Sequence, residues 1–115
     1  MHTLWFTLRF AEPINHEEIM DNLYSSEFLM ATEKMSSNKV FSFGRDHGYH
    51  GRLLSHGIVA EQSLHVKDNA LTGYCFTPQD GNALLSSVAA TVQHYYKDDW
   101  REKMDIFNQY IFKNI

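Results

Sequence analysis

The sequence predicts an α+β domain in which an antiparallel or mixed sheet packs against helices on one of its faces. Segments with alternating apolar residues come first in the chain, and two amphipathic helical repeats follow them. Alternating strands bury one side of a sheet, and amphipathic helices need an apolar surface to cover, so the two kinds of element pack together. We therefore expect a sandwich of ferredoxin-like character.

The N-terminal part of the chain predicts a strand followed by a helix. Residues 2–10 alternate, and one side of this strand is apolar throughout: Leu4, Phe6, Leu8 and Phe10. After a break at Pro13, Asn15 and Glu18 have the spacing of a helix N-cap and its capping-box partner. We predict a helix over residues 16–24.

The middle of the chain predicts four more strands. Residues 28–33 and 40–43 are short apolar runs that suit strands. Residues 58–66 alternate, and residues 71–77 return as their partner after a turn at 68–69, which predicts a hairpin.

The last part of the chain predicts two helices. Asp80 or Asn82 can cap the first of them, and the second begins at about Asp98. One side of the second helix is either a core stripe or a dimer surface, and it carries Trp100, Phe107 and Ile111. The predicted element order is therefore β-α-β-β-β-β-α-α.

The composition restricts the classes of function. The chain has 115 residues, which is enough for a single domain over residues 1–115, and 43% of them are hydrophobic. Its formal net charge of −4, with scattered lysines and arginines, argues against a nucleic-acid-binding protein, because such proteins need a basic face to neutralise phosphates. No segment has the roughly 20 consecutive apolar residues of a membrane-spanning helix, so we expect no membrane partner.

The cysteine content indicates the cellular compartment. Cys75 is the single cysteine, which excludes an internal disulfide and a zinc site built from several cysteines. The N-terminus lacks the pattern of a signal peptide, so we expect a cytoplasmic protein. Cys75 lies between two aromatic residues in a predicted strand, where a cysteine fills space more often than it acts as a nucleophile.

Residues 44–56 depart most clearly from an ordinary globular composition, because they include three glycines, three histidines and two arginines. Arginine side chains offer a planar fork to carboxylate or phosphate, although surface arginines at strand ends are the more common case. A helix start at 80–82 would add free backbone N–H groups, unless these residues are a plain helix cap. The candidate residues for binding a small anionic ligand are Arg45, His47, His50, Arg52, Asp80 and Asn82.

The same segment raises the question of a metal site. Asp46, His47, His50 and His56 carry groups that ligate metals, but the His-Glu-x-x-His spacing is absent and the glycines loosen the geometry. We predict no metal site and no cofactor bound by this chain alone.

Three features near the N-terminus occur together. His2 opens the alternating strand, a Glu-Pro-Ile break follows at residues 12–14, and acidic residues begin the next helix. In these features residues 2–19 resemble the opening of the C-terminal domain of the aspartate-semialdehyde dehydrogenase and glyceraldehyde-3-phosphate dehydrogenase-like family. Residues 43–46 resemble the glycine-arginine strand end of that domain, and residues 55–89 are similar to its late strand and closing helix.

The resemblance implies a catalytic role only for His2. In the family this histidine is a general base for a cysteine nucleophile held on a separate nucleotide-binding domain, and hydride passes to a nicotinamide cofactor. This chain has no glycine fingerprint of a nucleotide-binding domain and no cysteine in a nucleophile context. His2 is therefore catalytic only if another domain completes the site, and the chain by itself is not a complete enzyme.

Two hypotheses of function follow. The leading one is a small dimerising interaction or regulatory module that resembles the C-terminal domain of semialdehyde dehydrogenases. Its expected partners are a second copy in a homodimer and a separate nucleotide-binding subunit. The alternative is a small enzyme or binding protein for a small anionic ligand, which would use residues 44–56 and the helix start at 80–82.

Overall fold

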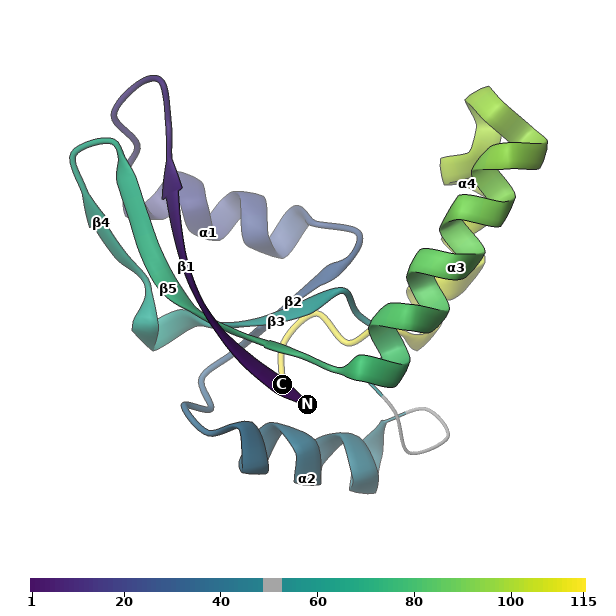
Figure 1. The fold of residues 1–115 in the computed structure, drawn as a ribbon, viewed down its shortest axis with the longest axis horizontal. Helices are drawn as coiled ribbons and strands as arrows, with labels where there is room; N and C mark the ends of the chain where they lie inside the picture. The colour runs from purple at the N-terminus through teal and green to yellow at the C-terminus, as the bar shows by residue number, and fades with distance from the viewer. Residues whose placement is uncertain (49–52) are drawn as a thin grey trace.

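The computed structural model describes residues 1–48 and 53–115 (Figure 1). The strands of this part of the chain are β1 (His2–Arg9), β2 (Leu29–Thr32), β3 (Gly57–Ala60), β4 (His65–Lys67) and β5 (Ala70–Thr77). Its α-helices are α1 (His16–Ser25), α2 (Ser37–His47), α3 (Gln79–Tyr96) and α4 (Trp100–Met104). Short 3₁₀ helices cover Glu61–Ser63, Lys97–Asp99 and Asp105–Tyr110.

The strands form one mixed sheet in the order β1-β5-β3-β2. β5 pairs antiparallel with the whole of β1 on one side, and with β3 and β4 on the other. β2 and β3 are parallel, and α2 makes the crossover connection between them. The predicted α+β fold with a mixed sheet is confirmed.

The helices pack against both faces of the sheet rather than against one. Neighbouring residues of β3 point to opposite faces, so Val59 packs with Leu23 of α1 while Ile58 packs with Val40 of α2. We call these the α1 face and the α2 face of the sheet, and Figure 1 shows the two helices on opposite sides. The larger core lies on the α2 face, where the start of α3, α4 and the C-terminal segment complete it.

The segment 40–43, predicted as a strand, lies inside α2. Val40 and Gly44 are buried and Phe41 is exposed, which is the spacing of a helix face and not the alternation of a strand. Because β2 and β3 are parallel, a crossover element between them is also required. The element order is thus β-α-β-α-β-β-β-α-α, which differs from the ferredoxin-like βαββαβ order.

Several local predictions hold. Asn15 caps α1, and its Oδ1 accepts a hydrogen bond of 2.8 Å from the Glu18 N–H. The turn at 68–69 joins β4 to β5 in a hairpin, with Asp68 at a φ of 54°. The predicted strand over 58–66, however, is divided into β3 and β4 by the 3₁₀ helix Glu61–Ser63.

The start of α3 differs from the prediction. Pro78 is the N-cap, and its carbonyl accepts the first helical hydrogen bond from the Asn82 N–H at 2.9 Å. Asp80 and Asn82 therefore lie within the first turn of α3 and do not cap it.

The apolar side of the last predicted helix belongs to the core. Ile111 is buried in the core of the α2 face, and Trp100 and Phe107 pack against that core.

Within the described ranges 1–48 and 53–115, none of the helices combines the length and the apolar character needed to cross a membrane.

Candidate functional site: an apolar groove beside an open sheet edge

The α1 face of the sheet carries an open groove of about 730 Å³. Residues of β1 and β5 form its floor, and α1 provides one wall. Apolar side chains dominate the lining, among them Leu4, Phe6, Leu8, Ile19, Leu23 and Leu71. A volume of this size lies within the range of roughly 300–1,000 Å³ that is usual for binding sites of small molecules.

Two leucines of β1 remain half exposed in this groove. Leu4 and Leu8 each keep 49% of their surface accessible, although the alternation of β1 predicts a buried face. Burying a leucine side chain contributes about 1.5–3 kcal/mol, so two half-exposed leucines leave roughly 2 kcal/mol available to a binding partner. Covering this apolar surface with a binding partner would therefore lower the free energy.

The two edges of the sheet differ. The C-terminal segment runs alongside β2, where the Ala31 N–H donates to the Lys113 carbonyl at 3.0 Å and the Ile115 N–H donates to the Ala31 carbonyl at 3.1 Å. At the opposite edge, β1 presents eight residues. Among the residues described, no backbone hydrogen bond reaches the outer side of β1. An uncovered edge of this length is a template for pairing with another strand.

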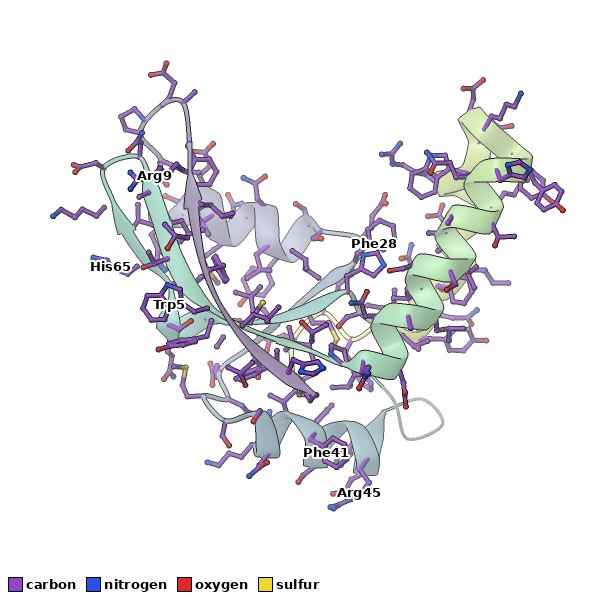
Figure 2. The ribbon with its side chains drawn as sticks, viewed as in Figure 1. Trp5, Arg9, Phe28, Phe41, Arg45 and His65 are labelled. Carbon is purple, nitrogen blue, oxygen red and sulfur yellow. The ribbon has the colours of Figure 1, made fainter. Side chains whose placement is uncertain are left out.

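The other side of the β1 edge is aromatic and polar. Trp5 is 62% exposed and meets Tyr74 edge to face, with ring centroids 4.7 Å apart. Figure 2 shows Trp5, Arg9 and His65 at the same end of the sheet, well away from α3. This part of the α2 face is not covered by α2, so β1 is accessible from both of its faces.

One end of the groove is polar. Here Nε2 of His56 lies 3.2 Å from Oγ of Ser86, and the Ser86 hydroxyl donates to Oδ1 of Asn82 at 3.0 Å. Which of the two atoms donates, Nε2 of His56 or Oγ of Ser86, depends on the tautomer of the His56 ring. The His56 ring also stacks on Phe28, with centroids 4.7 Å apart, and burial lowers the pKa of His56. This group of polar side chains can hydrogen-bond to a ligand at this end of the groove.

Of the residues predicted to bind an anion, Arg45 and His47 lie in the last turn of α2, and Asp80 and Asn82 lie in the first turn of α3. Arg45 lies near the end of α2, where its Nε is 2.7 Å from Oδ1 of Asp46, and this contact raises the pKa of Arg45 and lowers the pKa of Asp46. Figure 2 shows Arg45 on the side of α2 that points away from the sheet. His47 stacks on Phe43 with centroids 4.8 Å apart. The remaining two residues of this segment, His50 and Arg52, lie outside the described residues.

Asp80 and Asn82 are divided between two cavities. Asp80 lines a cavity of about 230 Å³ together with Gly44 and Met1, whereas Asn82 lines the groove. The structure does bring the end of α2 and the start of α3 together, as the anion hypothesis requires.

His2 and Cys75 both belong to the paired strands β1 and β5. His2 pairs with Thr77, so the histidine is held at the first position of β1. Cys75 pairs with Leu4 and packs beside the core of the α1 face, and burial raises its pKa. A protonated thiol inside a strand is not an activated nucleophile.

Three features of the structure were not predicted from the sequence. A helical signal for α2 was present, since Val40, Phe43, Gly44 and His47 have the spacing of one helix face. No comparable signal marks β1 as an edge strand, because edge and central strands can show the same alternation. The contact between His56 and Ser86 joins residues 30 positions apart and has no local signature.

Within the described portion of the chain, no group of three or more histidine, cysteine, aspartate or glutamate side chains is placed to hold a metal ion. No model of a protein family matches the chain, and a search of curated proteins finds no significant match.

Proposed function

We propose that this chain is a homodimerising α+β module of the kind that forms the sheet interface and substrate side of semialdehyde dehydrogenases. In this proposal it acts as an interaction or regulatory part and binds no cofactor by itself. The observation that carries the proposal is the half exposure of Leu4 and Leu8 beside the uncovered edge of β1.

Burying the apolar surface around β1 against a protein partner is more favourable than leaving it exposed to solvent. The exposed leucines, the open groove and the aromatic pair of Trp5 and Tyr74 all lie around β1. Stable interfaces bury about 800 Å² on each partner and concentrate apolar and aromatic side chains at their centre. The region around β1 has this composition, with the groove on one face and the aromatic pair on the other.

The catalytic part of the proposal depends on a second protein. His2 is held in β1 at the position that the resemblance assigns to the general base, but Cys75 has a raised pKa and is partly buried. A nucleophile and a nicotinamide cofactor would have to come from a separate nucleotide-binding subunit. Adding nicotinamide cofactors to this chain alone should leave its melting temperature unchanged, and a clear upward shift would contradict a role without its own cofactor.

The alternative, a protein that binds a small anion, has weaker support. Arg45 is already engaged by Asp46 at 2.7 Å, and Asp80 and Asn82 line two separate cavities. The proposed function therefore rests on protein association and not on an anion site.

Light scattering over a range of concentrations tests the association. We expect a species of twice the chain mass of 13.4 kDa. Replacing the two half-exposed leucines (L4S/L8S) should shift the protein to monomer, because the apolar surface at β1 is lost. The matched control is Phe41→Ser, which removes an apolar side chain that is 58% exposed on α2, and this variant should remain dimeric. A wild-type protein that stays monomeric at millimolar concentration would contradict the proposal.

A further inference from the structure

We propose that the dimer forms by antiparallel pairing of β1 with β1 of a second copy, with Phe6 of one copy facing Phe6 of the other across a twofold axis. One continuous sheet would then run through both copies. The inference rests on the proposed function and adds to it the surface and the strand register.

The hydrogen bonds at Phe10 show which backbone groups of β1 point away from β5. The Phe10 N–H donates to the Asn69 carbonyl at 2.9 Å, and the Asn69 side-chain amide donates to the Phe10 carbonyl at 2.9 Å. Phe10 thus directs both of its backbone groups toward the β5 side. Because these groups alternate along an antiparallel strand, the even-numbered residues of β1 face β5. The residues whose N–H and C=O groups point outward are Thr3, Trp5, Thr7 and Arg9.

One register of β1 against β1 of a second copy uses all of these outward-pointing groups. With Phe6 on the axis, Thr3 faces Arg9 of the second copy and Trp5 faces Thr7. Each of the four resulting pairs exchanges two hydrogen bonds, which gives about eight bonds between the copies. A register with Trp5 on the axis leaves Arg9 without a partner in β1, and a register with Thr7 on the axis does the same to Thr3. The sequence of β1 therefore favours the register centred on Phe6.

The side chains of β1 also suit this register. In this register Leu4 of each copy faces Leu8 of the other on the α1 face, and the two Phe6 rings meet between these pairs. The contacts cover the two leucines that are 49% exposed in the single chain. On the α2 face no like charges oppose each other, because Arg9 faces Thr3. Both faces of the strand are thus compatible with a second copy in the same register.

The state of the two sheet edges explains why pairing should occur at β1. Natural sheets protect their edges with covering segments, prolines, short strands or inward-pointing charges. The edge at β2 is covered by the C-terminal segment, and Oγ1 of Thr32 donates to the Ile115 carbonyl at 2.8 Å. β1 has eight residues and no proline, and Arg9 at its end is its one lysine or arginine. A twofold pairing also closes the assembly, so no edge of β1 remains for a third copy.

Cysteine cross-linking tests the register directly. In a Cys75→Ser background, Phe6→Cys should form a disulfide between copies, because facing residues at this type of position are about 4.5 Å apart at Cα. Phe10→Cys is the matched control, since it lies on the same face of the sheet but should be roughly 26 Å from its counterpart in this register, at about 3.3 Å per residue. We expect cross-linking at position 6 and none at position 10.

A pair of charge variants tests the same register without cysteines. Trp5→Glu with Thr7→Glu places like charges opposite each other twice, whereas Trp5→Glu with Thr7→Lys places opposite charges there. Both variants lose the same tryptophan, and they differ only in the sign of the charge at position 7. We expect the Glu/Lys protein to dimerise about tenfold more tightly than the Glu/Glu protein. Circular dichroism of each variant verifies that the fold is retained.

The outcomes separate this inference from the proposed function. A wild-type chain that is monomeric by light scattering would overturn both. A dimeric wild type that cross-links at position 10 but not at position 6, or whose two charge variants dimerise equally, would overturn edge pairing while the proposed function stands. In that case the dimer would use the groove on the α1 face of the sheet.

Discussion

The ring of Phe6 occupies the space that a side chain at Gly73 would fill. The two residues are antiparallel partners, and a Cβ at Gly73 would lie 3.0 Å from Cζ of Phe6 and 2.8 Å from Cδ2 of Leu64. Gly73 therefore allows Phe6 to lie against the sheet and helps to shape the floor of the groove. This relationship connects the stability of the fold to the surface proposed for dimerisation.

Gly73→Ala should destabilise the protein by about 1 kcal/mol, because overpacking costs more than alanine gains over glycine in a strand. Urea unfolding monitored by circular dichroism measures the change. The control is Gly57→Ala, where the new Cβ would meet Leu29 at an ordinary 3.4 Å, and this variant should be neutral or slightly stabilised. If both variants gain stability equally, Phe6 does not lie over Gly73.

His56 should make the stability of the protein dependent on pH. Burial lowers the pKa of His56 in the folded state, so below its usual value of about 6.5 the unfolded chain takes up a proton more readily. Stability contributed by neutral His56 is therefore present above pH 6.5 and is lost as the pH falls through the folded-state pKa. His56→Gln should flatten this dependence when urea midpoints are compared between pH 8 and pH 5.

Ser86→Ala provides the control for the histidine. It removes the hydrogen bond at 3.2 Å but leaves the His56 ring against Phe28, so most of the pH dependence should persist, since burial is its cause. A pH dependence that is the same in wild type and His56→Gln would show that other histidines account for it.

Cys75 should react slowly with thiol reagents in the folded protein. Its partial burial raises the pKa, and the thiolate is the reactive form. Labelling at pH 8 should be several-fold slower in buffer than in 6 M urea, where the chain is unfolded. Equal rates in the two conditions would mean that the fold does not protect the thiol, and a faster rate in buffer would reopen the question of a nucleophile in this chain.

The sequence predicted well those elements that depend on residues near one another in the chain. The cap formed by Asn15 with the Glu18 N–H spans three positions, and the hairpin turn at 68–69 has the short polar loop that such turns require. Residues 40–43 were assigned wrongly because a short apolar run fits a strand or a helix equally well. The parallel pairing of β2 and β3, a long-range feature, places a crossover helix there.

The candidate site was much less predictable. Arg45 and Asp80 drew attention because of their chemistry, but α2 and α3 place Arg45 in a pair with Asp46 and Asp80 in a separate cavity from Asn82. The contact between His56 and Ser86 could not be expected from spacing, since β3 and α3 meet only in the folded chain.

The sequence by itself determined that β1 alternates and that one of its faces is apolar. Only the tertiary structure decided that β1 lies at the edge of the sheet, so that Leu4 and Leu8 stay half exposed while Ile58 in an inner strand is fully buried. Alternation is a property of consecutive residues and reports which side of a strand is apolar. Burial depends on what lies beyond the strand, and that is set by pairing between residues that are distant in the sequence.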